Sequence, residues 1–167
     1  MGPFRPSLSV FDRAAVAGGI VFVFASAVDL GTKVYAVEHG GLGLVVYNNT
    51  HNGDFERRVI MSVAALAFTV AAAVVARRRG IGRLWGAWIG AGLLIGGVLS
   101  NGVSQFIWSR GTPDFIHVYS MSPDVWNIAD FEIWWGLTGG VFSIAIAALI
   151  AFARERIPRR GTPVSES

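Results

Sequence analysis

The chain has 167 residues, of which 53% are hydrophobic and only 15% are charged, and its mean hydropathy is +0.51. This length suits a single domain, and this composition is too apolar for an ordinary soluble protein. Because there is no cysteine, disulfides and thiolate metal sites are excluded. The basic residues gather beside apolar runs instead of forming a stripe with aromatic residues, so the pI near 10.0 does not indicate nucleic-acid binding.

Four apolar stretches predict membrane-spanning helices, because about 20 apolar residues cross the hydrocarbon core. They cover residues 14–30, 59–76, 84–107 and 133–153. We therefore expect an all-α membrane protein with four transmembrane helices, forming one integral membrane domain over residues 1–157. Residues 158–167 are predicted to form a disordered tail. A second interpretation of the first stretch stays open, since residues 1–27 also resemble a cleavable secretory signal peptide that ends in the small residues Ala25–Ala27.

The charges predict the orientation of these spans. Ten of the fourteen Lys and Arg residues lie before the first span, between the second and third, and after the fourth. By the positive-inside rule, both termini then face the cytoplasm. The segments 34–57 and 108–130 face outward, and "LGLVVY" within the first of them has the β-branched and aromatic residues of a short strand. We expect a small extracytoplasmic cap that contains β-structure.

Three polar features of the spans need an explanation, because ionisable groups at membrane depth are costly and usually functional. Asp29 and Lys33 are four residues apart at the outer end of the first span, which also suits an ordinary ion pair at a helix end. Asn101, Ser104 and Gln105 share one helix face, and they could equally be hydrogen-bonding contacts between helices. Asp130 precedes the fourth span, where an aspartate often caps a helix.

Other kinds of site find little support in the sequence. The three histidines, His39, His51 and His117, have no metal-ligand spacing, so we expect no metal. There is no Gly-rich phosphate loop, nucleophile elbow or haem motif, and we expect no cofactor. A small channel or transporter would be expected to show broken helices or inverted repeats, and neither is evident. This class nevertheless remains an alternative.

Together the polar motifs resemble those of the lipoprotein signal peptidase family, also called signal peptidase II. "VDLGTK" resembles the first family motif and matches Asp29 and Lys33. "GGVLSNGVSQ" resembles the segment that ends in Asn-x-x-Asp-Arg and matches Asn101. "PDFI" and "WNIADFEI" resemble the Val-Asp and Phe-Asn-x-Ala-Asp motifs, and the matching residues are Asp114, Asn127 and Asp130.

One further match is looser. "NNTHNGDF" resembles the family's Asn-x-Gly-Ala-Ala-Phe loop beside the substrate groove, with Asn52 as the matching residue. The resemblance implies a multi-pass protein of the bacterial cytoplasmic (inner) membrane, with membrane lipid around it. It also implies an aspartic endopeptidase that cleaves prolipoprotein signal peptides, with no metal and no nucleic acid as partner. Because the first motif ends at Lys33, the resemblance favours retention of the first span over its cleavage as a signal peptide.

The chain departs from the family at its first catalytic position. Ser104 stands where the family has an aspartate, and Gln105 stands where it has the adjacent arginine, whereas the second catalytic aspartate is kept as Asp130. In an aspartic protease two carboxyl groups share one proton, so that one acts as base on water and the other as acid. A serine hydroxyl cannot accept the proton of water near neutral pH.

Substitutes for the missing acid are hard to find in the sequence. A serine nucleophile at Ser104 would need a base within reach, and no Lys or His is close to it along the chain. Asp114 already matches another family position, and Glu132 lies about 200° around the helix from Asp130. We therefore expect impaired peptidase activity. The main alternative is a non-catalytic relative that binds signal peptides, lipoproteins or a membrane partner.

Overall fold

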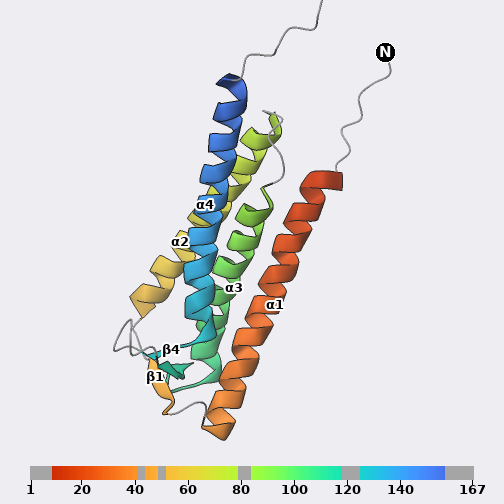
Figure 1. The fold of residues 1–167 in the computed structure, drawn as a ribbon. Helices are drawn as coiled ribbons and strands as arrows, with labels where there is room; N and C mark the ends of the chain where they lie inside the picture. Colours follow the sequence, from red (N-terminus) through yellow and green to blue (C-terminus); the bar gives the residue numbers. More distant parts are fainter. Residues whose placement is uncertain (1–8, 41–43, 49–51, 79–83, 118–124, 157–167) are drawn as a thin grey trace, which may run out of the picture.

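The computed structural model describes residues 9–40, 44–48, 52–78, 84–117 and 125–156. Most of these residues lie in four helices, which are α1 (Ser9–His39), α2 (Asn52–Arg78), α3 (Trp85–Ile107) and α4 (Ile128–Arg156). The helices form an elongated bundle in which the start of α1 and the end of α4 lie at the same end (Figure 1). The end of α2 and the start of α3 lie there too. This largely helical architecture, with small sheets, agrees with the helical character of the expected fold class.

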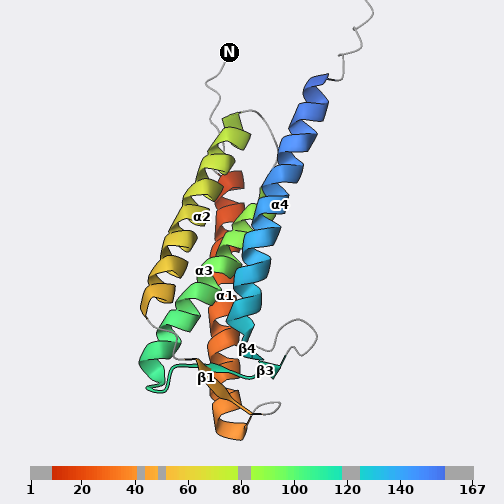
Figure 2. The same ribbon diagram turned by 90° about the vertical axis from the view of Figure 1, so that its left-hand side faces the viewer.

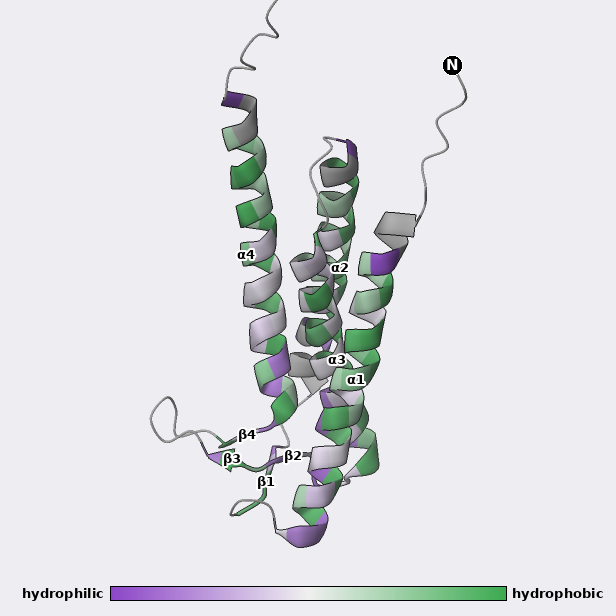
Figure 3. Ribbon diagram, turned by 45° about the vertical axis from the view of Figure 1, so that its right-hand side comes forward, coloured by the Kyte–Doolittle hydropathy of each residue, from purple (hydrophilic) through white to green (hydrophobic). Residues whose placement is uncertain are grey.

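Three of the four helices are long and apolar enough to cross a membrane, over the segments Arg13–His39, Trp85–Ile107 and Ile128–Ala153. Within the described residues, the apolar stretch of α2 is shorter and covers Ser62–Val75. Figure 3 shows apolar residues along the middle of the bundle and hydrophilic residues near its ends.

The first and last helices are longer than the apolar stretches that predicted membrane spans. α1 continues to His39, beyond residue 30, and α4 begins at Ile128, before residue 133. Within these extensions, Lys33 and Asp130 have hydrogen-bond partners inside the bundle.

α3 is the central helix of the bundle, since it packs against α1 and α4 along its length and also contacts α2 (Figure 2). Glycines make this close approach possible. A Cβ added at Gly90 would lie 2.6 Å from the carbonyl oxygen of Gly136, and one added at Gly97 would lie 2.6 Å from that of Ala129. Small residues allow helix backbones to approach closely in a bilayer, where van der Waals contact replaces the hydrophobic effect between helices. The contact at Gly97 places the middle of α3 against the start of α4.

Two short antiparallel sheets cover the end of the bundle at which α1 ends and α4 begins. β1 (Val46–Asn48) pairs with β2 (Thr112–Asp114), and β3 (Ile116–His117) pairs with β4 (Val125–Trp126). The first pairing joins the segment after α1 to the segment after α3. Because β4 leads directly into α4, the strands fix both Asp114 and the start of α4 at this end (Figures 1 and 2).

Candidate functional site

Asp29 and Lys33 form a buried ion pair on α1. Their side chains are 0% exposed, and the Lys33 Nζ lies 2.5 Å from Asp29 Oδ2. The pair forms because residues four apart on a helix face the same side. Asp29 Oδ1 also accepts a hydrogen bond of 2.8 Å from the backbone N–H of Ala129. The pair is therefore an internal link between α1 and α4, and not a solvated pair at a helix end.

Lys33 extends this link to α3. Its ammonium donates a 2.6 Å hydrogen bond to the side-chain oxygen of Asn101. The amide nitrogen of Asn101 in turn donates to Asp130 Oδ1 over 3.3 Å. Both ends of one amide side chain are used, which fixes its orientation. A continuous chain of contacts thus runs from Asp29 to Asp130, and we call these four residues (Asp29, Lys33, Asn101 and Asp130) the polar chain.

The start of α4 holds Asp130 by a reciprocal capping arrangement. The backbone N–H of Asn127 donates to Asp130 Oδ2 over 3.1 Å, and the backbone N–H of Asp130 donates to Asn127 Oδ1 over 3.3 Å. This is the pattern of a capping box, with Asn127 as the cap. The alternative interpretation took Asp130 as the cap residue, but the cap lies three positions earlier, at Asn127. Both carboxylate oxygens of Asp130 accept hydrogen bonds, and its side chain is still partly exposed.

Asp114 lies beside this arrangement on β2. Its Oδ1 accepts a 2.5 Å hydrogen bond from the side-chain nitrogen of Asn127. Burial and the nearby negative charge of Asp130 raise the pKa of Asp114 to about 6, against the opposing effects of Asn127, Lys33 and Asn48. Asn127 therefore connects two carboxyl groups, Asp114 through its side chain and Asp130 through its backbone.

Ser104, which the sequence motifs match to the family's other aspartate, is buried on α3. The side chain is 0% exposed, and its hydroxyl donates a 2.6 Å hydrogen bond to the backbone oxygen of Ser100. A serine within a helix often forms such a bond one turn back. Of the polar face expected on α3, Asn101 is the member that contacts Asp130, and Gln105 is half-buried one residue after Ser104. Asn52 is the first residue of α2, and its side chain lies outside the described residues.

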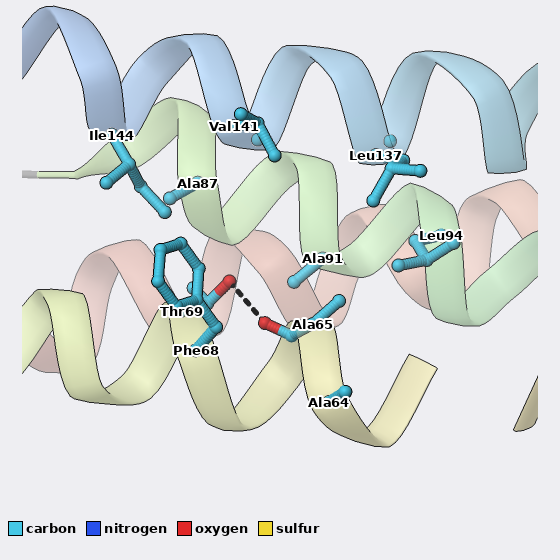
Figure 4. Close-up of a pocket in the computed structure, with 12 residues that line it drawn as sticks. Ala64, Ala65, Phe68, Thr69, Ala87, Ala91, Leu94, Leu137, Val141 and Ile144 are labelled. Carbon is cyan, nitrogen blue, oxygen red and sulfur yellow. Dashed lines mark hydrogen bonds between the residues drawn. The ribbon is translucent and has the colours of Figure 1, made fainter. Parts of the chain in front are cut away.

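Deeper in the bundle, an apolar cavity of about 280 Å³ lies between α2, α3 and α4. Figure 4 shows its lining side chains. They are mostly small or aliphatic, and Thr69 satisfies its hydroxyl by donating to the backbone oxygen of Ala65. α2 and α4 make little direct contact. The cavity therefore separates the two helices within the apolar part of the bundle.

Two residues near the site, Thr112 and Glu132, were not identified as site residues from the sequence. The Thr112 hydroxyl donates to the backbone oxygen of Asn101 over 3.3 Å, and nothing in the sequence marked this threonine. Glu132 is buried with 8% exposure, and a glutamate within an apolar helix was the available signal. Within the described residues, no group of three or more His, Cys, Asp or Glu side chains is placed to hold a metal ion.

The relationship of this chain to known proteins follows from a protein-family match. The family model of signal peptidase (SPase) II matches residues 20–150 of the chain. The chain belongs to this family. No curated protein and no solved structure matches it. The matched range contains every residue of the polar chain, together with Ser104, Asp114 and Asn127. Members of the signal peptidase II family are membrane proteins that process lipoproteins, which agrees with the three long apolar helices.

Proposed function

We propose that this chain binds the signal peptides of prolipoproteins at the end of the bundle where the strands lie, and that it cleaves them much more slowly than a complete aspartic peptidase. The hydrogen bonds around Asp130 support this proposal, because they orient its carboxylate. Asp130 has one oxygen toward Asn101 and one toward the start of α4, so its carboxylate is fixed in direction. A fixed carboxylate can act as a base on a water molecule.

The observation that carries the reduced activity is the hydroxyl of Ser104. It donates to the backbone of its own helix, and it has no acidity that would let it exchange a proton with Asp130 near neutral pH. The two-carboxyl mechanism needs both a base and an acid at the scissile bond. Loss of one general acid or base costs about 10²–10⁴ in rate.

The apolar cavity supports a binding role. Signal peptides carry an apolar segment of 7–15 residues. The cavity between α2, α3 and α4 lies in the apolar part of the bundle and is lined by residues such as Leu94, Leu137 and Ile144. We propose that apolar side chains of the substrate enter here from the membrane, while the cleavage region lies near Asp130.

The proposal includes the cellular setting. We place the protein in the bacterial cytoplasmic membrane with both termini in the cytoplasm and all four helices crossing the bilayer. The charge distribution supports this orientation, because Arg77–Arg79 and Arg83 lie in the sequence between the second and third predicted spans. α2 then spans with the help of its flanking arginines, which can extend to the interface.

The test is incubation of the purified protein in lipid nanodiscs with a lipid-modified prolipoprotein. We expect saturable binding and a cleavage rate at least about 100-fold below that of a complete family enzyme. Asp130→Asn should abolish the remaining cleavage while binding persists. Ser104→Ala serves as the matched control and should change neither property. Fast cleavage that survives Asp130→Asn would disprove this mechanism, and the absence of any binding would disprove the substrate class.

A further inference from the structure

Glu132 is a buried acid that the polar chain does not use. Its side chain is 8% exposed, and within the described part of the molecule its Oε2 has no hydrogen-bond partner. An unsatisfied buried polar atom is uncommon in a native structure and calls for an explanation. An ionisable group at this depth of a membrane protein is more often functional than incidental.

The surroundings of Glu132 come from three helices. On α3, a Cβ added at Gly97 would lie 3.2 Å from the Glu132 Cβ, so the glutamate begins in the close contact between α3 and α4. On α1, the charges that act on it are those of Asp29 and Lys33. α3 contains no ionisable residue at all, and the nearest acid along α4 is Asp130, two residues earlier.

The cation among the charges that act on Glu132 is Lys33, and it is already paired with Asp29 at 2.5 Å. An ionised Glu132 would therefore add an uncompensated negative charge beside Asp29, and burying an unpaired charge is far more costly than burying a neutral acid. The neutral acid needs only one acceptor for its proton, which a buried water can supply.

We propose that Glu132 is a proton-binding site, which holds a proton in the resting state and controls the polar chain by releasing it. This proposal goes beyond signal-peptide binding and does not depend on cleavage. Glu132 is a positioning residue and not a catalytic one, because the charges that act on it are those of the buried Asp29–Lys33 pair.

The mechanism follows from the donors of Lys33. An ammonium has three N–H groups, and two of them serve Asp29 and Asn101. When Glu132 loses its proton, two carboxylates compete for one ammonium. Lys33 then moves toward the acids and weakens its bond to Asn101, the residue that orients Asp130. The protonation of Glu132 thus sets how firmly Asp130 is held.

Infrared difference spectroscopy of the full chain in nanodiscs tests the proposal directly. At neutral pH we expect a carbonyl stretch from a protonated carboxylic acid, which disappears in Glu132→Gln when both proteins carry Asp114→Asn, a change that removes the other acid of raised pKa. Glu38→Gln is the matched control, because Glu38 is an exposed glutamate on α1, and it should leave the band unchanged. Glu132→Asp should keep the band and shift its frequency. A wild-type spectrum without this band, or a band that survives Glu132→Gln, would overturn the proposal.

Thermal unfolding gives an independent readout. Glutamine resembles the neutral acid in shape, so Glu132→Gln should change Tm at neutral pH by less than about 2 °C. A Glu132→Gln variant that fails to fold, or that loses more than about 5 °C, would mean that an ionised Glu132 is required and would contradict a proton-bound resting state.

Discussion

The Lys33 ammonium donates a 2.6 Å hydrogen bond to the side-chain oxygen of Asn101, 68 residues away in the sequence. This bond joins the buried ion pair of α1 to the residue of α3 that contacts Asp130. It makes the position of Asp130 depend on a charged pair that lies on another helix.

The first prediction concerns the buried pair itself. Lys33→Met leaves the Asp29 carboxylate without its cation, and breaking a buried pair in this way costs about 3–5 kcal/mol. We expect a large fall in Tm, measured in detergent or nanodiscs. The double variant Asp29→Asn with Lys33→Met removes the stranded charge and should recover much of this loss. Equal destabilisation by the single and double variants would show that the charge is not the cause.

The second prediction restores the missing acid. Ser104→Asp should raise the cleavage of a prolipoprotein, and adding Gln105→Arg should raise it further, because Asp130 regains a carboxyl partner that can share its proton. The expected gain is about 10²–10⁴-fold. It should vanish when Asp130→Asn is added. A well-folded Ser104→Asp, Gln105→Arg variant that binds the substrate but cleaves no faster would contradict this account of the lost activity.

The third prediction is a pH effect from Asp114. Its pKa is raised to about 6 in the folded protein, so its contribution to stability is fully present below the pKa of the unfolded chain and is lost as the pH rises through 6. The expected loss between pH 4 and pH 8 is on the order of 2–3 kcal/mol. Asp114→Asn keeps an acceptor for Asn127 and should flatten the profile, as followed by Tm against pH. An unchanged slope in the variant would assign the effect to another group.

The fourth prediction tests the apolar cavity. Ala64 and Ala67 are both exposed alanines of α2, but only Ala64 lines the cavity. Ala64→Trp should fill it and weaken signal-peptide binding by at least about tenfold, which corresponds to about 1.4 kcal/mol. Ala67→Trp should leave the affinity unchanged. Equal effects of the two tryptophans, measured by titration with a fluorescent signal peptide, would place the substrate elsewhere.

The fifth prediction concerns orientation. Because the chain has no cysteine, single cysteines can be introduced for labelling without a background signal. Arg78→Cys at the end of α2 should react with an impermeant thiol reagent only from the cytoplasmic side, and Glu56→Cys near its start only from outside. Both positions are exposed in the structure. Labelling of both cysteines from the same side would mean that α2 does not cross the membrane.

The local part of the site could be predicted from the sequence. The spacing of Asp29 and Lys33 predicts their contact, since it depends only on the geometry of one helix. The contact of Lys33 with Asn101 could not be predicted, because it depends on how α1 crosses α3, and that crossing is set by glycines spread over several turns. Contacts that depend on packing between helices are not encoded in a local spacing.

For the candidate functional residues Ser104 and Glu132, too, the sequence could not predict the contacts that depend on helix packing. The sequence places Ser104 on the polar face of α3, but its hydroxyl bonds to the helix backbone, a choice that depends on which groups lie opposite. The helix geometry also places Glu132 away from Asp130. It does not reveal that the charges of the buried pair on α1 act on Glu132, and the proposed role of the glutamate rests on this fact.

The buried ion pair also has a consequence for the assembly of the protein during synthesis. α1 enters the membrane first, carrying Asp29 and Lys33, but Asn101 and Ala129 are made 68 and 100 residues later than the side chains they contact. Until α3 and α4 arrive, the pair has only itself as a partner in an apolar environment. A chain that lacks α4 therefore lacks a hydrogen bond to Asp29 and is less stable in the membrane. We expect membrane proteases to degrade such a truncated polypeptide. The contacts that orient Asp130 therefore also make the stability of the chain in the membrane depend on the presence of both α3 and α4.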